Sequence, residues 1–136
     1  MNRVIKFRGK RSDDGKWIYG YLADEDYINN INEIAMPSEE VDSDTVGQFT
    51  GLYDLRRNEI YEGDVVFWIA TDMRGHGRGE QGAIIWDAHT MSWAILRDKP
   101  TVDGRPCIIS RPFDKKHLEV VGNIHDNPEL MERSNK

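Results

Sequence analysis

The stretch VGQFTGLYDLRRNEIYEGDVV, residues 46–66, decides how the chain is organised. It places three glycines and two arginines, with several acids, between short apolar runs. Glycine adopts positive backbone φ at the least cost, and aspartate side chains accept hydrogen bonds from nearby backbone amides. We therefore expect turn chemistry here, which joins an N-terminal region to a C-terminal one. The turn and register determinants that we expect are Gly47, Gly51, Asp54, Gly63 and Asp64.

Downstream of this stretch, short runs rich in β-branched and aromatic residues follow one another without a long amphipathic helix. The runs are residues 60–70, 82–89, 91–98, 107–110 and 118–124, and a glycine-rich loop over 71–81 separates the first two. Short strands at this spacing are typical of a small barrel. Their order predicts an SH3-like barrel, in which the strand at 65–70, apolar on both faces, is covered on both sides.

Upstream, residues 3–22 predict a β-hairpin, because two β-rich runs flank the turn-forming pair Asp14-Gly15. Trp17, Tyr19 and Tyr21 alternate along the second arm and so share one face. We expect that face to be covered by the rest of the protein, or otherwise by a partner.

Residues 23–45 are weakly patterned, and both a short helix and an irregular strand fit them. Ile28, Ile31 and Ile34 are candidates to pack at an interface between copies or against the barrel. At the other end of the chain, Asn127 as an N-cap and Pro128 at the first helical position predict a short C-terminal helix.

The fold class that follows is mainly β, with an N-terminal hairpin region packed on a C-terminal SH3-like barrel. The expected divisions are an N-terminal β-rich region at 1–58, the barrel at 59–127 and a C-terminal helix or tail at 128–136, together forming one compact unit.

The net charge of −6 in 136 residues argues against general nucleic-acid binding, which depends on lysine and arginine neutralising phosphates. The one concentrated basic run covers residues 6–11. The interaction surface that we expect combines this run with the aromatic face and consists of Lys6, Arg8, Lys10, Arg11, Trp17, Tyr19 and Tyr21. A single cysteine, Cys107, suits a reducing cytoplasm, and neither a membrane helix nor a secretory signal is expected.

Catalytic motifs are not recognisable in the sequence. The glycines of GHGRG, residues 75–79, lack the spacing and the Gly-Lys-Ser/Thr of a phosphate-binding loop, and the histidines lack metal-ligand spacing. Glu62 and Asp64 are the carboxylates that an enzyme would use, but a turn that enters a strand explains them better. We predict no catalytic, cofactor-binding or metal-binding residues.

Three blocks of the chain resemble the YopX family of phage and prophage proteins. IKFRGK with DGKWIYGYL is similar to its first block, DTVGQFTGLYD with NEIYEGDVV to its central block, and EVVGNIHDNPELM to its last. The departure is at Leu55-Arg56-Arg57, where the family commonly has a polar, glycine-containing turn. The resemblance implies a small, mainly β protein without an established enzymatic activity, so no catalytic residues carry over.

Our preferred hypothesis is a phage- or prophage-encoded, non-catalytic interaction protein of the bacterial cytoplasm that associates with itself and has a host or phage protein as a further partner. The first alternative is a nucleic-acid-associated protein that uses residues 6–11 and barrel aromatics. The second is an enzyme that uses Glu62 and Asp64.

Overall fold

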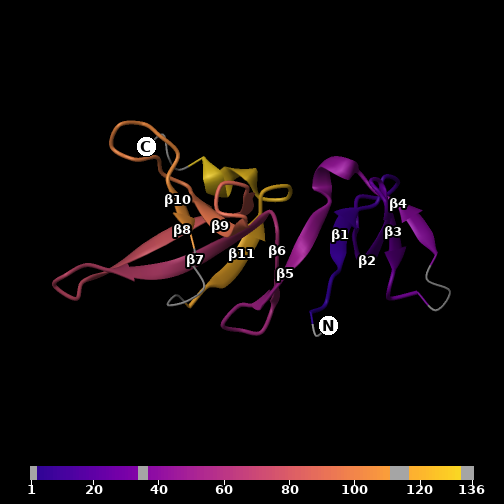
Figure 1. Ribbon diagram of the computed structural model, residues 1–136, viewed down its shortest axis with the longest axis horizontal. Helices are drawn as coiled ribbons and strands as arrows, with labels where there is room; N and C mark the ends of the chain where they lie inside the picture. Colours follow the sequence, from indigo (N-terminus) through magenta and orange to yellow (C-terminus); the bar gives the residue numbers. More distant parts are fainter. Residues whose placement is uncertain (1–2, 34–36, 111–116, 133–136) are drawn as a thin grey trace. The chain divides into compact units, whose positions relative to one another are not determined.

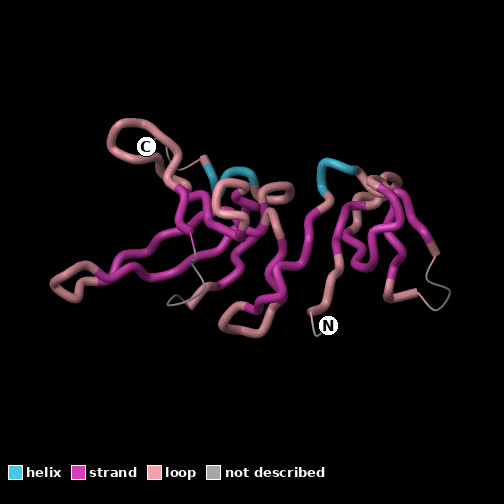
Figure 2. Tube along the Cα trace, in the orientation of Figure 1, coloured by secondary structure: helices cyan, strands magenta, loops and turns pink. Residues whose placement is uncertain are grey.

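The computed structural model describes residues 3–33, 37–110 and 117–132, and most of these residues lie in β-strands (Figure 2). The chain divides into two compact units, Met1–Leu52 and Tyr53–Lys136, so the division falls within the 46–66 stretch. The fold is therefore mainly β, as predicted. In the described part of the chain, no helix has the length and apolar character needed to cross a membrane.

The first unit contains an antiparallel sheet in the order β4-β3-β2-β1-β5 (Figure 1). Its strands are β1 (Phe7–Lys10), β2 (Trp17–Asp24), β3 (Tyr27–Asn30), β4 (Ser38–Glu40) and β5 (Gly47–Tyr53), and the 3-10 turn η1 (Ser43–Thr45) precedes β5. The predicted hairpin is present as β1 and β2, and Gly15 in its turn has a φ of +72°.

The small core of the first unit lies on one face of this sheet and consists of Ile18, Ile28 and Val41. Because side chains alternate along β2, its three aromatic residues point to the opposite face. There Trp17 and Tyr19 are half-buried, whereas Tyr21 is 51% exposed. The expectation that the rest of the protein covers this aromatic face is therefore wrong at Tyr21, and cover by a partner stays a prediction.

The weakly patterned segment forms strands rather than a helix. β3 pairs with β2 on one side and with β4 on the other. Ile28 is completely buried in the core, Ile31 is exposed, and Ile34 lies outside the described residues. Ile28 and Ile31 thus do not form one surface, because Ile28 lies in the core and Ile31, in the turn after β3, is exposed.

The second unit contains an antiparallel sheet in the order β10-β9-β8-β7-β11 (Figure 1). Its strands are β7 (Asp64–Thr71), β8 (Gly77–Asp87), β9 (Ser92–Arg97), β10 (Ile108–Ser110) and β11 (Glu119–Asn123). The strand β6 (Glu59–Tyr61), which follows β5 in the chain, is not part of this sheet. All five runs expected from the sequence form strands. The buried core comprises Ile60, Val66, Trp68, Ile84, Ile95 and Leu118.

The predicted SH3-like barrel is not confirmed, because the described strands form an open sheet. β10 has three residues and pairs only with β9, so no pairing in the described residues closes the sheet onto β11. The C-terminal helix is not confirmed either. Pro128–Met131 form a single 3-10 turn, η2, and the Asn127 side chain accepts a hydrogen bond from Asn123 N (3.2 Å) instead of capping it. Residues 133–136 lie outside the described part of the chain.

The glycine-rich loop predicted over 71–81 is shorter than expected, because β8 already begins at Gly77. Residues 77–81 pair with 67–71 of β7, whereas β9 pairs with β8 only from Gly82 onward. β7 and β8 therefore extend beyond the sheet as a two-stranded ribbon (Figure 1), which we define as residues 68–81.

The extension is explained by two β7 side chains, Phe67 and Ile69, which pack over glycines of β8 that have no side chain in the way. A Cβ on Gly79 would lie 2.8 Å from Cε2 of Phe67, and one on Gly77 would lie 2.9 Å from Cγ2 of Ile69. Ile69 nevertheless remains 59% exposed. The expectation that the strand at 65–70 is covered on both sides is therefore wrong at its outer end.

Trp86 and Trp93 face each other across β8 and β9, with ring centroids 5.2 Å apart in an edge-to-face arrangement. Only Trp93 packs against the core, whereas Trp86 is 49% exposed. We expect Trp93→Ala to lower the free energy of unfolding by ~3–5 kcal/mol and Trp86→Ala by about 1 kcal/mol. Urea unfolding of both variants measures the difference, and equal losses would contradict this packing.

Gly63 joins β6 to β7 with a φ of +90°. A side chain is unfavourable in this conformation, so Gly63→Ala should destabilise the protein by about 1 kcal/mol or more. An unchanged melting temperature would show that the glycine is needed for something other than backbone geometry.

Candidate functional site

The turn between β5 and β6 is built around the buried carboxylate of Asp54. Oδ1 accepts hydrogen bonds from Arg56 N (2.9 Å) and Asn58 N (2.8 Å), and Oδ2 accepts from Asn58 Nδ2 (3.2 Å). Oδ2 also accepts from Val120 N (3.0 Å), 66 residues away in β11. One aspartate therefore closes its own turn and fixes the position of a distant strand. Arg57, in the same turn, has a φ of +68°.

These hydrogen bonds decide the charge state of Asp54. Burial raises the pKa of the carboxyl group. Hydrogen bonds from the amides of Val120, Asn58 and Arg56 and from the Asn58 side chain lower the pKa by more than burial raises it. The net result is a pKa below the ordinary aspartate value. Asp54 is therefore an ionised structural group rather than a candidate general acid.

The other expected turn residues are defined by their backbone hydrogen bonds, their φ angles or their strand pairing. Asp64 is 2% exposed, and its Oδ2 accepts a hydrogen bond from Tyr61 N (2.7 Å). Gly63 N donates to Ile84 O (2.9 Å). Gly51 has a φ of +87°, whereas Gly47 lies within β5 opposite Arg8 of β1.

Glu62, the other carboxylate considered for catalysis, is half-buried. No three histidine, cysteine or acidic side chains in the described ranges are grouped to hold a metal ion.

A groove of about 450 Å³ lies beside the outer half of β7 in the second unit. Its lining combines apolar side chains with two titratable ones: Leu55, Phe67, Trp68, Ile69, Thr71, His117 and Glu119. Leu55 is held there because its amide donates to Leu118 O (2.9 Å). Leu55 and Ile69 are 55% and 59% exposed, which is unusual for large aliphatic side chains that lie together.

Sequence reasoning missed this groove. Its one local signal is Leu55, an apolar residue between Asp54 and two arginines in an otherwise polar turn. Arg56 borders the groove and forms an ion pair with Glu119 at 3.4 Å.

The basic residues of the predicted interaction surface lie over aromatic rings. The Arg8 guanidinium lies 4.6 Å from the centre of the Trp17 ring, and Lys10 Nζ lies 5.5 Å from the same ring. Lys6 Nζ lies 5.3 Å from the centre of Phe49 in β5. Cation–π contacts of this kind stabilise the sheet, so these cations already have partners in the fold.

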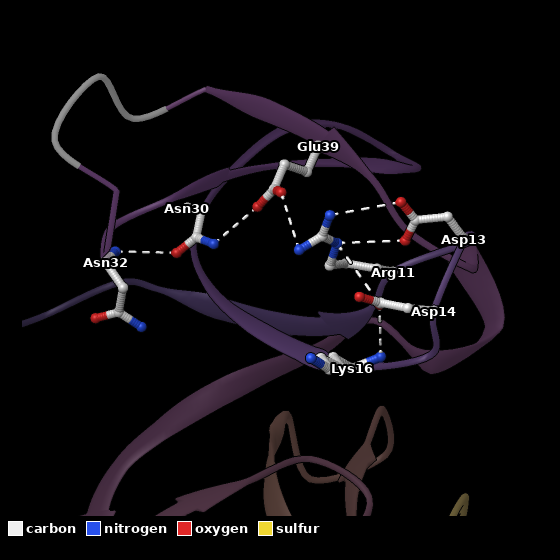
Figure 3. Close-up of polar contacts among 7 residues, drawn as sticks. All are labelled: Arg11, Asp13, Asp14, Lys16, Asn30, Asn32 and Glu39. Atoms are coloured by element: carbon white, nitrogen blue, oxygen red, sulfur yellow. Dashed lines mark hydrogen bonds and ion pairs between the residues drawn. The ribbon is translucent and has the colours of Figure 1, made fainter.

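Arg11 belongs to a different arrangement, a chain of polar contacts across the edge of the first sheet (Figure 3). Its guanidinium lies 3.4 Å from Glu39 Oε1, 3.4 Å from Asp13 Oδ1 and 3.6 Å from Asp14 Oδ1. Glu39 accepts a hydrogen bond from Asn30 Nδ2 (2.7 Å). The arrangement ties the β1–β2 turn to β4 and β3.

Arg11 and Asp14 both stay ionised in this arrangement. Desolvation lowers the pKa of Arg11, but the surrounding carboxylates raise it by more. The hydrogen bond from Lys16 N, followed by the charge of Arg11, keeps the pKa of Asp14 below its usual value despite partial desolvation. A hollow of about 380 Å³ lies beside these groups. The hollow is acidic, because Glu40 and Asp13 join its lining.

Comparison with known families agrees with the strand pattern and the three sequence blocks. The model of the YopX protein family matches residues 6–132. The chain belongs to the YopX family. Among solved structures, this YopX-family chain is similar to protein EF1440 from Enterococcus faecalis, with a TM-score of 0.52 and 24% sequence identity. The match covers 96% of this chain and 100% of the other, and it concerns the fold alone. Comparison with curated proteins finds no match.

The carboxylate of Asp54 should make stability depend on pH. Because its folded-state pKa is below the unfolded value of about 3.9, its ionisation stabilises the fold above that pH, and the contribution is lost as pH falls through the folded pKa. Asp54→Asn should lower the free energy of unfolding by about 2 kcal/mol or more at neutral pH. The difference from the unaltered chain should shrink below about pH 4, as urea unfolding across pH can measure.

Asp72→Asn is the matched control. Asp72 makes the same kind of turn contact, with Oδ1 accepting from Arg74 N and His76 N (both 2.8 Å), but it is exposed to solvent and reaches no distant strand. We expect a loss of about 1 kcal/mol or less for Asp72→Asn. Similar losses for the two variants would contradict the special role of Asp54.

Proposed function

We propose that this YopX-family chain is a phage- or prophage-encoded interaction protein that acts in the bacterial cytoplasm by binding and associates with a second copy of itself. The family resemblance supports the phage origin. A single cysteine, which has no intramolecular partner with which to form a disulfide, agrees with a reducing compartment. A host or phage protein is a further partner under this proposal.

The observation that carries the proposal is the apolar groove beside β7. Leu55 and Ile69 expose large aliphatic surfaces next to Phe67, and exposed apolar surface of this kind marks sites where other macromolecules bind. Few charged groups interrupt the groove, and its Glu119 is already paired with Arg56. Burial of these side chains against a partner would provide the driving force for association.

A role in binding rather than catalysis is supported by how two buried carboxylates are used, the catalytic candidate Asp64 and the turn residue Asp54. Asp64 is buried and accepts a backbone hydrogen bond, and Asp54 is fully engaged in its turn. A general acid or base must instead reach the proton that it transfers.

The nucleic-acid alternative has weaker support. The cations at positions 8 and 10 lie over Trp17, and Arg11 is surrounded by three carboxylates. Phosphate binding would have to compete with these contacts and with a net charge of −6.

Sedimentation equilibrium of the full chain at micromolar concentrations tests self-association. We expect a weight-average mass that rises with concentration above the 15.7 kDa of one chain. A constant mass of 15.7 kDa over the whole concentration range would refute self-association. Low salt and high salt should give similar results, because the driving force is apolar.

A further inference from the structure

The apex of the ribbon, residues 72–76, is a turn whose backbone is held by its own hydrogen bonds. Asp72 Oδ1 accepts from Arg74 N and His76 N (both 2.8 Å), and Asp72 N donates to His76 O (2.9 Å). Gly75, with a φ of +83°, donates from its amide to Asp72 O (3.0 Å). A turn that is ordered before binding loses less conformational entropy when a partner binds.

Two neighbouring side chains of this turn take no part in holding it together. Met73 is fully exposed to solvent. Arg74 is also exposed and forms no ion pair within the described part of the chain. The apex lies beyond the apolar groove, whose lining follows β7 only as far as Thr71. An apolar side chain and a cation are therefore presented together at the end of the ribbon.

Arg78 extends the basic surface along the ribbon. Its side chain is 76% exposed although its Nε lies 2.9 Å from the buried Glu80. The exposed acid is Asp72, which accepts two turn amides. Residues 72–78 contain this aspartate and two arginines, so their formal charge is +1 with the histidine neutral. The outer ribbon thus differs in sign from the chain as a whole, which has a net charge of −6.

The ribbon also separates these cations from the charges on the sheet. The four residue pairs from Trp68–Glu80 to Thr71–Gly77 extend it by about 14 Å, at about 3.4 Å for each pair. Exposed charges are screened over about 8 Å at physiological ionic strength. Acidic groups on the sheet therefore oppose an anion at the apex only weakly.

We propose that the ribbon is an arm that contacts duplex DNA, with Met73 and Arg74 in the minor groove and Arg78 on the adjacent phosphates. Proteins that bind the minor groove combine arginine, which the negative potential of the groove attracts, with an apolar side chain wedged between base pairs. The groove is about 6 Å wide, so it admits the apex side chains and leaves the two-stranded body of the ribbon against the phosphates.

Duplex DNA suits this apex better than RNA or a single strand. The minor groove of duplex RNA is wide and shallow, so a narrow apex makes few contacts in it. Single strands are bound by aromatic side chains on which the bases stack, and residues 72–78 contain no tyrosine, phenylalanine or tryptophan. The inference goes beyond the proposed function and uses neither the apolar groove nor the basic run at residues 6–11.

Fluorescence anisotropy of the full chain with a short, labelled A·T-rich duplex tests the arm. Arg74→Ala should raise the dissociation constant about tenfold and reduce the slope of log K against log salt by about 1. Met73→Ala should raise the dissociation constant by about fivefold or more without changing that slope, because it removes a wedge and no charge. Energy transfer between dyes at the duplex ends should show less bending with Met73→Ala.

Met91→Ala and Arg105→Ala are the matched controls. Met91 is 78% exposed in the turn between β8 and β9, and the Arg105 side chain is 79% exposed in the loop before β10. Neither residue belongs to the ribbon, so both variants should bind the duplex as the unaltered chain does. Circular dichroism checks that all four variants are folded.

The outcomes separate DNA binding from self-association. Weaker binding by both apex variants, with both controls unchanged, supports the arm. The inference is overturned if the unaltered chain does not bind the duplex at about 50 mM salt, or if both apex variants bind it normally. Equal binding to duplex RNA or to heparin also overturns it, because any polyanion would then suffice. Sedimentation equilibrium should give the same masses for the apex variants and the unaltered chain, so loss of the arm leaves self-association intact.

Discussion

The second unit depends on the carboxylate of Asp54, which accepts three hydrogen bonds within its own turn and one from Val120 in β11. An ionised carboxylate is a strong acceptor, and here it satisfies amides that the strand ladder leaves unpaired. The turn then holds Leu55 against Leu118 O. The interaction that fixes β11 therefore also places the apolar rim of the groove.

A second buried carboxylate, that of Glu80, lies where the ribbon begins. Glu80 is buried, and it accepts hydrogen bonds from Arg97 Nη2 (2.6 Å) and Arg78 Nε (2.9 Å). Burial raises the pKa of Glu80, but the two arginines lower it by more. Pairing of β8 with β9 ends at Gly82 opposite Arg97, so this ion pair lies at the base of the ribbon. Loss of Arg97 would leave the buried Glu80 with the exposed Arg78 as its cation, and removal of one partner of a buried ion pair is destabilising.

The local sequence pattern was sufficient to predict the strands, but it could not predict the side-chain contacts that join them. Period-two alternation and the Asp14-Gly15 pair predicted the first hairpin, and β-rich runs predicted β7 to β11. Glycine content favoured a loop at 77–81, because the sequence does not show that Phe67 and Ile69 pack over those glycines. Likewise, aspartate predicted a turn at position 54, but its bond to Val120 depends on chain folding over 66 residues. The ion pair of Arg11 with Glu39 depends on strand order in the same way.

The two edges of the ribbon differ in what they offer to an added strand. Gln81 O accepts from Asp98 N on the β9 side, so by alternation Gly79 and Gly77 present their backbone groups along that edge. A strand added there would gain hydrogen bonds but would bury no side chains of those two residues. On the β7 side, Ile69, Phe67 and the groove provide apolar surface. Because side-chain packing across strands provides most of the stability of a sheet, the β7 side of the ribbon has more apolar surface to bury than the β8 side.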